Sequence, residues 1–382
     1  MKKRIDYIIK HNRIVQYIYK IVASLLLRLI GIFIRIDDRL VLFNAHGRKY
    51  NDSPKAIFLY MVNNPKYKDY KLVWALDEPD AYDIPGCDKV KMDTLQYFII
   101  ALRAKYWITC VNIERGLNFK RKDTVYLNTW HGTPLKLVGN AVSGRKDFNF
   151  SSIDIFCYAG EFEKEIYIRD FKVNEFSLLL SGLPRNDELY QVSRAKKDHY
   201  RKLLNIPAEK KVILYAPTWR DSVDKGKSYS ISPPINITDW QDELEDEYIL
   251  LLRTHAYTNK LLGVNFNDFV RDFSRYTDIN HLLFIADILI SDYSATIFDY
   301  SILERPIICF GYDYKDYLEN RGFYFDLEKV LPGGVLRTQH EVIDKIKRMD
   351  YREECKKTGI LKNKFLEEGG FATQKCVDAL MK

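Results

Sequence analysis

The stretch Asp123-Thr-Val-Tyr-Leu-Asn-Thr-Trp130-His131-Gly132-Thr133-Pro134-Leu135-Lys136 sets the expected architecture of the chain. Residues 123–128 contain β-branched and apolar residues that predict a short buried strand. A histidine at the carboxyl end of a strand, followed by Gly and Pro, lies where open α/β sheets bind ligands. Gly132 allows a tight turn or a close backbone approach, and Pro134 fixes the backbone that follows. His131 is therefore a candidate catalytic residue, with a hydrogen-bonded structural histidine as the alternative.

Size and composition favour a globular protein of two domains. A chain of 382 residues is too long for one ordinary core, and 47% of its residues are hydrophobic. The six cysteines are scattered without a CxxC pair, which is typical of reduced thiols in the cytosol and argues against a zinc site or a disulfide framework. The net charge of +7 suits an anionic partner such as a phosphate ligand, acidic lipid or nucleic acid.

Residues 1–36 predict an amphipathic helix at a membrane surface. On a helical wheel, a polar stripe that includes Lys20, Ser24, Arg28 and Gly31 lies beside a wide face of Ile, Val, Leu and Phe. Charges interrupt the apolar run, which argues against a transmembrane span, and no signal-peptide cleavage site follows it. We expect this helix to lie in the membrane interface, attracted by anionic lipid. A helix packed on the protein's own core is the alternative.

From residue 37 onward, apolar strands alternate with helical segments. This alternation predicts an α/β fold with two mostly parallel, Rossmann-like sheets. Strands are expected at residues 40–43, 70–76, 89–92, 104–110, 123–128 and 154–158, and then at 211–215, 248–252, 287–290 and 306–310. Turn-forming residues at 181–187 mark the boundary. We therefore expect an N-terminal domain at 37–190 and a C-terminal domain at 191–382, facing each other across a cleft.

Charged candidates lie just beyond the predicted strands. His255 follows an apolar strand in the second domain, as His131 does in the first. Two such histidines can face each other, one as base on an acceptor hydroxyl and one at the leaving group. Arg185, Arg220 and Arg253 lie in loops at the expected cleft and can neutralise a diphosphate. A hydrogen-bonded loop histidine and a solvated surface arginine are the alternatives.

The run Ser291-Asp292-Tyr293-Ser294-Ala295-Thr296 is a candidate phosphate-binding segment. It follows a predicted strand and opens a helix, so its hydroxyl and N–H groups meet the positive end of a helix dipole. Helix capping by Ser and Thr is the alternative. The chain has neither GxGxxG nor GxxxxGK[ST], which argues against a dehydrogenase-type dinucleotide fold and a P-loop NTPase.

Five motifs occur in order along the chain. They are Trp130-His-Gly-Thr-Pro-Leu-Lys136, Gly182-Leu-Pro-Arg-Asn-Asp187, Tyr215-Ala-Pro-Thr-Trp-Arg-Asp221, Arg253-Thr-His255 and Ile290-Ser-Asp-Tyr-Ser294. Together they resemble the CDP-glycerol glycerophosphotransferase family, the teichoic-acid primases and polymerases. The resemblance covers roughly residues 40–380.

The resemblance implies a GT-B-like pair of Rossmann domains and transfer from CDP-glycerol or CDP-ribitol to a lipid-linked teichoic-acid or capsular glycan. It implies release of CMP without a metal or cofactor, at the cytoplasmic face of a bacterial membrane. By the same resemblance His131 and His255 are catalytic. It implies substrate contacts from Trp130, Gly132, Thr133, Pro134, Arg185, Ala216, Pro217, Arg220, Arg253, Thr254, Ser291, Asp292, Tyr293, Ser294, Ala295, Thr296 and Asp299.

Two other functions stay open at this point. One is a GT-B glycosyltransferase that uses a nucleotide sugar and releases a nucleoside diphosphate instead of CMP. The other is a non-catalytic nucleotide-binding protein at the membrane surface, against which the retention of both histidine motifs argues. Nucleic-acid binding is disfavoured because basic residues gather in the N-terminal helix and the cleft loops. Glycerol versus ribitol, the acceptor and the oligomeric state are left open.

Overall fold

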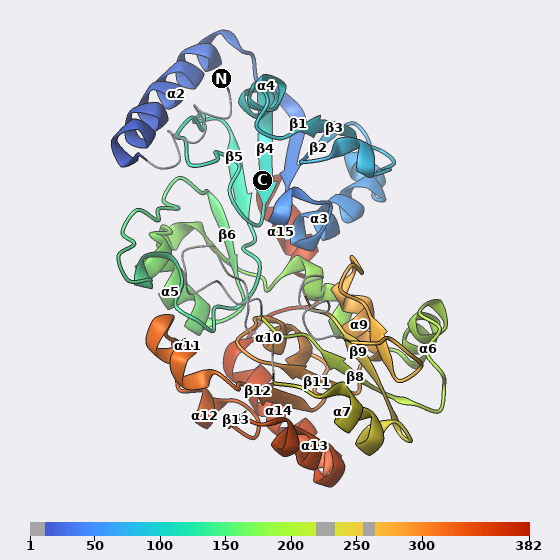
Figure 1. The fold of residues 1–382 in the computed structure, drawn as a ribbon. Helices are drawn as coiled ribbons and strands as arrows, with labels where there is room; N and C mark the ends of the chain where they lie inside the picture. Colours follow the sequence, from blue (N-terminus) through green and yellow to red (C-terminus); the bar gives the residue numbers. More distant parts are fainter. Residues whose placement is uncertain (1–11, 219–233, 255–263) are drawn as a thin grey trace.

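The computed structural model describes residues 12–218, 234–254 and 264–382 of the 382-residue chain. Two α/β units, each built around its own sheet, lie one above the other in Figure 1. The predicted pair of parallel α/β sheets is confirmed. The predicted residues Arg220 and His255 lie outside the described part of the chain.

Seven parallel strands form the N-terminal sheet, in the order β3-β2-β1-β4-β5-β6-β7. The central strand is a continuous apolar run, and Val41, Leu42 and Phe43 are all 0% exposed because helices cover both faces. The strands are β1 (Asp37–Asn44), β2 (Lys71–Leu76), β3 (Asp88–Lys91), β4 (Ala104–Thr109), β5 (Val125–Asn128), β6 (Ile155–Tyr158) and β7 (Leu178–Leu180).

Helices and short 3-10 turns connect these strands. The hydroxyl of Thr94 accepts the Tyr97 N–H at 3.2 Å and so starts α4, while Lys172, at a left-handed φ of 58°, ends α5. The helices are α3 (Asp52–Val62), α4 (Leu95–Arg103) and α5 (Glu161–Phe171). The turns are η1 (His46–Arg48), η2 (Pro65–Tyr67), η3 (Pro79–Ala81), η4 (Gly139–Ala141), η5 (Glu175–Ser177) and η6 (Pro184–Tyr190).

Six parallel strands form the C-terminal sheet, in the order β10-β9-β8-β11-β12-β13. They are β8 (Lys211–Tyr215), β9 (Tyr248–Leu252), β10 (Val270–Asp272), β11 (Ile288–Ser291), β12 (Ile307–Phe310) and β13 (Val335–Leu336). The predicted strands 211–215 and 248–252 coincide with β8 and β9. The edge strands β7, β10 and β13 were not predicted, because two or three residues are too few for a period to be recognised.

The helices of the second half of the chain, with the exception of the last one, lie around this sheet. A capping box starts α13, in which the Thr338 hydroxyl accepts the Glu341 N–H and the Glu341 carboxylate accepts the Thr338 N–H. The helices are α6 (Arg194–Leu203), α7 (Ile237–Leu244), α9 (Ile279–Ile285), α10 (Thr296–Ser301), α11 (Tyr314–Asn320), α12 (Leu327–Val330), α13 (Gln339–Arg348), α14 (Tyr351–Phe365) and α15 (Ala372–Leu380).

Each sheet has a switch point where its strand order reverses. In the N-terminal sheet this point lies between β1 and β4, and in the C-terminal sheet between β8 and β11. Ligands of open α/β sheets bind outside the carboxyl ends of the strands at such points. His46 and Cys110 follow the first pair of strands, while Ala216 and Asp292 follow the second.

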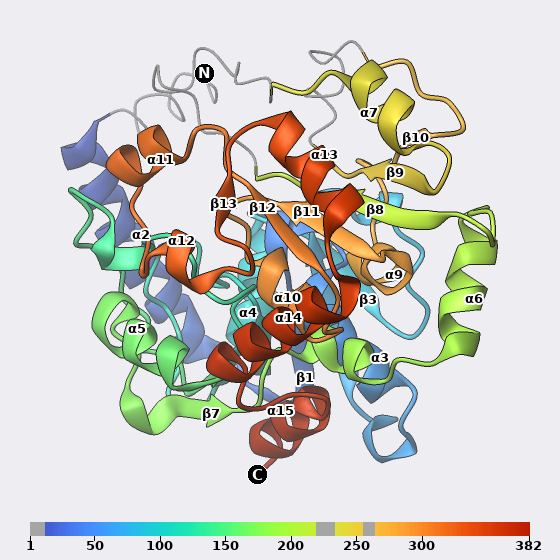
Figure 2. The same ribbon diagram turned by 90° about the horizontal axis from the view of Figure 1, so that it is seen from below.

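Helix α15 returns from the C-terminal half to the N-terminal sheet (Figures 1 and 2). Cys376, Val377 and Leu380 are buried in the same apolar cluster as strands β1 and β2. Asp187, in η6, accepts the N–H groups of Ala372 and Thr373 at 2.8 Å each. The domain division at 190/191 stays a prediction, and the last helix contributes to the core of the first sheet.

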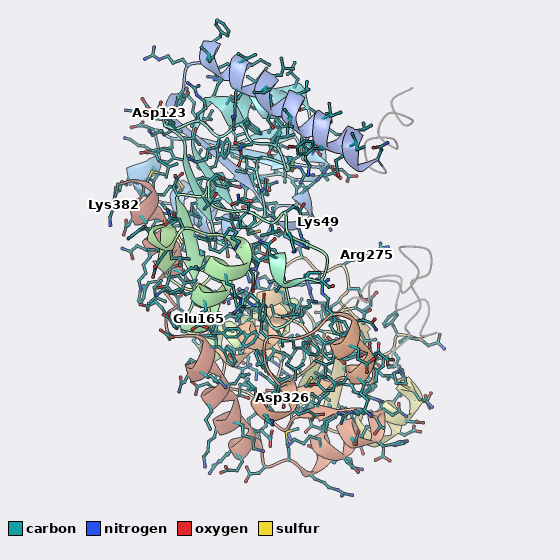
Figure 3. All side chains as sticks on the ribbon, turned by 90° about the vertical axis from the view of Figure 1, so that its left-hand side faces the viewer. Lys49, Asp123, Glu165, Arg275, Asp326 and Lys382 are labelled. Carbon is teal, nitrogen blue, oxygen red and sulfur yellow. The ribbon has the colours of Figure 1, made fainter. Side chains whose placement is uncertain are left out.

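Helix α2 (Arg13–Phe33) lies on the outer side of the N-terminal unit, away from the C-terminal sheet (Figures 1 and 3). The Asn118 N–H donates to Ser24 Oγ at 3.0 Å, and Arg28 Nε donates to the Asn118 carbonyl at 2.8 Å. Gly31 is buried against Leu102. These residues of the polar stripe contact the protein, so this side of the helix lies against the domain, and the attachment of the helix to a membrane surface stays a prediction.

The opposite face of α2 is apolar and exposed. It consists of Ile14, Ile18, Ile21, Val22, Leu25, Leu26, Leu29, Ile32 and Phe33. By length and composition alone, residues 14–33 are long and apolar enough to cross a membrane. Buried core helices and signal sequences also meet this criterion, so the prediction that this helix does not span the membrane stays a prediction.

Asp187→Ala is expected to loosen α15 from the N-terminal sheet. The change removes the acceptor for two N–H groups at the start of that helix, a loss of capping worth roughly 1–2 kcal/mol of unfolding free energy. Hydrogen exchange of residues 372–380 should accelerate. Asp350→Ala is the control, because Asp350 also accepts two N–H groups at a helix start, as the local N-cap of α14, and its loss should leave the exchange of α15 unchanged. Equal exchange of α15 in both variants would contradict this role.

Candidate functional site

His131 lies just beyond β5 and is oriented by a backbone carbonyl. Its Nδ1 is 2.8 Å from the carbonyl oxygen of Cys110, which follows the neighbouring strand β4. A carbonyl can only accept, so Nδ1 carries the proton and Nε2 is left with a lone pair. The ring is thus held in the tautomer that can take a proton at Nε2.

Burial keeps the His131 imidazole neutral. Desolvation lowers the pKa of His131 to about 4, against the opposing effects of the Cys110 carbonyl and the Asp52 carboxylate. The neutral form therefore predominates throughout the range around pH 7. A neutral imidazole is the form that a general base requires.

Trp130 is held by local chemistry that the sequence contains. Its N–H donates to the side-chain oxygen of Asn128 at 2.8 Å, an Asx-type turn that supports the left-handed φ of 53° at Trp130. The Trp130 ring packs on the His131 ring with centroids 4.0 Å apart. Asn128 also donates to the Val111 carbonyl at 2.9 Å, which ties the loops after β4 and β5 together.

Two groups near His131 were not predicted as site residues. The ring of His46, in η1, lies 5.2 Å from the ring of His131 between centroids. Asp52 starts α3 at a left-handed φ of 60°, and its charge favours a protonated His131. His46 does follow β1 within Asn44-Ala-His46-Gly47, so its position at a strand end was the available signal. Asp52 resembled an ordinary residue at a helix start.

Arg185 links both halves of the chain at this site. Its Nη1 donates to both carboxylate oxygens of Asp52 at 3.0 Å and to the His131 carbonyl at 2.9 Å. Its Nη2 donates to Asp299 of α10 at 2.8 Å. Despite desolvation, the Arg185 guanidinium lowers the pKa of Asp52 below its ordinary value. The predicted role of Arg185 in substrate binding stays a prediction, and here its guanidinium bridges two carboxylates.

Beside this arginine, the loop that follows β5 of the N-terminal sheet contacts the segment that precedes α10 of the C-terminal half. A Cβ on Gly132, where φ is +142°, would lie 2.6 Å from the Cβ of Ala295. Only glycine permits so close an approach, so the loop after β5 packs directly on the segment before α10. Further on, the Tyr324 N–H donates to the Leu135 carbonyl at 3.1 Å. The motif that contains His131 therefore packs against the C-terminal half at both Gly132 and Leu135.

Thr133 and Pro134 are buried, and beneath them lies a buried acid. Glu163 of α5 is 0% exposed, and its Oε2 accepts the Ala159 N–H at 2.6 Å. Burial raises the pKa of Glu163 to about 7, although the Thr133 side chain and the Ala159 N–H lower it. No motif marked Glu163, because a glutamate in a helix is ordinarily exposed.

In the C-terminal half, the Ser291–Thr296 run is largely tied to its own sheet. Ser291 is 0% exposed and donates to the Ala216 carbonyl at 2.7 Å. Asp292 Oδ1 accepts the N–H groups of Thr218 and Tyr293 at 2.7 and 2.6 Å. Ser294 Oγ accepts the Thr296 N–H at 3.2 Å as α10 begins.

These contacts divide the predicted donor residues into two groups. Ser291, Asp292 and Tyr293 are buried, while Ser294, Ala295, Thr296 and Pro217 are half-buried at the carboxyl end of the sheet. Arg253 donates to the Tyr276 carbonyl at 3.3 Å, and Thr254 Oγ1 is 3.4 Å from Ser274 Oγ. Their roles in donor binding stay predictions. Among described residues, no three His, Cys, Asp or Glu side chains form a metal site, and metal-free transfer likewise stays a prediction.

A cavity of about 560 Å³ opens next to Trp130 and His131, on the side of the N-terminal unit that carries α2. Lys20 of α2, Arg115 after β4 and Arg145 after η4 contribute cations to its lining. The cavity thus connects the candidate base with the outer helix.

Comparison with known proteins places the chain in a family. Residues 26–382 match the model of the family described as CDP-Glycerol:Poly(glycerophosphate) glycerophosphotransferase. The chain belongs to this family. It is therefore a transferase of the glycerophosphotransferase type, as its motifs implied.

Relatives support the assignment over the whole length. The chain is 33% identical to a teichoic acid poly(glycerol phosphate) polymerase of Bacillus spizizenii, with 100% of both chains covered. The structure of the wall teichoic acid polymerase TagF matches with a TM-score of 0.83 at 31% identity, covering 100% of this chain and 96% of the other. A histidine-to-asparagine variant of TagF soaked with CDPG matches with a TM-score of 0.81 at 33% identity, covering 91% and 89%.

The His131 imidazole is expected to remain neutral from pH 8 down to pH 5. With a pKa lowered to about 4 by burial, its titration should lie well below the ordinary value near 6.5. The measurement is a pH titration by NMR of protein labelled in the histidine rings, with His131→Asn identifying the signal. A midpoint between pH 6 and 7 would contradict a buried, neutral ring.

Glu163→Gln is expected to change how stability depends on pH. A folded pKa raised to about 7 means that the stability is fully present below the unfolded pKa and is lost as the pH rises through 7. Between pH 4.5 and 8, the wild type should lose roughly 3 kcal/mol relative to the variant. Urea unfolding across this range measures the difference. Glu161→Gln, an exposed change on the same helix, should run parallel to the wild type.

Proposed function

We propose that this chain transfers a glycerol-phosphate unit from CDP-glycerol to a hydroxyl group of a lipid-linked acceptor and releases CMP. Glycerol is favoured over ribitol because the family description and the full-length relative both name glycerol phosphate. A CDP-alditol donor is supported by the TagF structure soaked with CDPG.

The observation that carries this proposal is the tautomer of His131. The Nδ1 proton is committed to the Cys110 carbonyl, so Nε2 is the acceptor in a largely desolvated ring. The reaction needs such a group, because an alcohol is a weak nucleophile until its proton is removed. Asp52 supports the positive charge that the ring acquires.

The chemical step balances with His131 as base. The acceptor oxygen forms a bond to the phosphorus that carries glycerol, and its proton moves to His131 Nε2. The bridging P–O bond of the diphosphate breaks, and its electron pair leaves with CMP. His255, outside the described residues, keeps its predicted role at the departing phosphate.

The donor is assigned to the carboxyl end of the C-terminal sheet. Pro217 and Ser294–Thr296 lie there partly accessible, at the β8–β11 switch point. Gly132 contacts Ala295, so the loop that carries His131 adjoins the segment assigned to the donor. This proximity is what an in-line transfer requires.

Membrane attachment is assigned to the exposed apolar face of α2. The polar side of the helix contacts the domain, so the apolar side is free to enter a lipid surface. Attachment at the cytoplasmic face fits a lipid-linked acceptor and a soluble nucleotide donor. Apolar burial, more than the cationic stripe, supports this attachment.

His131→Asn is expected to lower the rate of CMP release by about 10²–10⁴-fold, as is typical for loss of a general base. The affinity for CDP-glycerol should change little, because the residue acts on the acceptor. Turnover and calorimetric donor binding are measured on the same preparations. Release of a nucleoside diphosphate instead of CMP would favour a nucleotide-sugar glycosyltransferase.

His46→Asn is the matched control for this experiment, because its ring lies beside that of His131. We expect a smaller loss of turnover than for His131→Asn. If His46→Asn abolishes transfer while His131→Asn retains it, the base is His46. If neither variant loses activity, the reaction takes place elsewhere.

Leu25→Asn together with Leu29→Asn is expected to weaken binding to lipid vesicles at least tenfold. Burying a leucine side chain is worth about 1.5–3 kcal/mol, and both residues are more than half exposed in the protein. Vesicle sedimentation provides the measurement. Point changes are preferable to deletion, because Leu27 of the same helix is part of the core.

Phe176→Asn serves as the control for the vesicle experiment, since Phe176 is 97% exposed on a different part of the N-terminal unit. Its binding should equal that of the wild type. Unchanged binding of the Leu25 and Leu29 variant would assign the membrane contact to another surface.

A further inference from the structure

We infer that the cavity between α2 and His131 binds the phosphate-bearing end of the acceptor, a polyol phosphodiester chain. This inference rests on the proposed function and names the acceptor subsite of that reaction. The cavity has a volume of about 560 Å³, which is large enough for a short segment of such a polyol phosphodiester chain and not only for a single phosphate.

The location of the cavity carries the first argument. Its lining includes Trp130 and His131 and also Lys20 of α2. The same helix that supplies Lys20 exposes an apolar face on its opposite side. An acceptor attached to lipid at that face would therefore reach His131 through this cavity, without crossing the C-terminal half.

The chemistry of the lining carries the second argument. Cationic side chains are contributed by Lys20, Arg115 and Arg145. Of these, Arg115 is paired with Asp93 at 3.0 Å, while Arg145 stands 3.7 Å from Asp147. The structure gives Lys20 no ion pair with a described residue. Lys20 and Arg145 are therefore the cations best placed to receive a phosphodiester.

Two acidic residues, Glu114 and Asp147, also line the cavity, and Glu114 does not oppose an anion as its charge alone would suggest. It is 5% exposed, and its Oε1 accepts the N–H groups of Phe119 and Lys120 at 2.8 and 3.0 Å. Ser152 Oγ donates to its Oε2 at 3.4 Å. The Glu114 carboxylate thus accepts hydrogen bonds from the residues that surround the cavity.

The remaining lining suits hydroxyl-rich carbon chains. Trp130, Phe148 and Phe150 form a connected aromatic group, with ring centroids between 4.5 and 6.2 Å apart. Asn112, Asn118, Asn149 and Ser151 provide amide and hydroxyl groups around it. Aromatic faces that bind C–H groups beside polar side chains that bind hydroxyls are suited to polyols.

The test measures binding of a soluble three-unit oligo(glycerol phosphate) to the full chain by calorimetry. Two variants change the cavity: Lys20→Gln with Arg145→Gln removes its cations, and Ser151→Trp fills it. We expect each to weaken oligomer binding about tenfold or more, with CDP-glycerol affinity unchanged. Absence of binding to the wild type, or binding in both variants equal to that of the wild type, would overturn the inference.

Arg39→Gln with Lys105→Gln is the matched control. It removes the same charge from the N-terminal unit, and neither residue lines the cavity. Oligomer binding should remain as in the wild type. If this control loses as much affinity for the oligomer as the cavity variant, the loss is due to the overall charge of the protein and not to the cavity.

Two further measurements distinguish an acceptor site from a lipid site and from a failure of the proposed reaction. Glycerophosphoglycerol, the headgroup of a common anionic lipid, should bind more weakly than the oligomer, and equal binding would indicate a lipid site instead.

CMP release from CDP-glycerol is measured separately with the wild type. Oligomer binding without any CMP release would refute the proposed reaction and leave the binding site standing, whereas CMP release without oligomer binding would refute the site alone.

Discussion

The ion-pair cluster around Arg185 is the interaction on which the arrangement of this site depends. One guanidinium bonds Asp52 from the N-terminal half, Asp299 from the C-terminal half and the carbonyl of His131. Breaking a buried pair by removing one partner typically costs about 3–5 kcal/mol, because the remaining charge is left without compensation. The three charged groups therefore favour one relation between the two sheets. That relation sets the position of the loop that carries His131 against the start of α10.

Much of the fold and part of the site could be predicted because the signals are local. Apolar runs indicated the central strands, and the positions of His131 and Ser291–Thr296 followed from where those runs end. Asp52 and Glu163 could not be found in this way. Asp52 lies 133 positions from Arg185 in sequence, and its role exists only when the two sheets are packed together. The hydrophobic periodicity of a sequence does not indicate an ion pair between residues so far apart.

The helical wheel of α2 illustrates a second limit. It separated a polar from an apolar side correctly, but it could not say which side faces the protein. Ser24 and Arg28 contact the backbone at Asn118, and these hydrogen bonds decided the outcome. Similarly, Ser291 had the right residue type for a phosphate contact, yet its hydroxyl donates to the neighbouring strand loop. Residue type and position narrow the candidates, and the direction of each side chain depends on tertiary packing.

The return of α15 to the first sheet bears on how the protein is made. Residues 372–380 cover part of the core formed by β1 and β2, and Asp187 anchors their first turn. During translation the N-terminal strands leave the ribosome long before this helix exists. One apolar face of that sheet must then stay partly uncovered until the final turns are synthesised, and exposed apolar surface of this kind makes a partly folded chain prone to aggregation. The protein therefore completes the core of its first sheet only after nearly all of the second has been made.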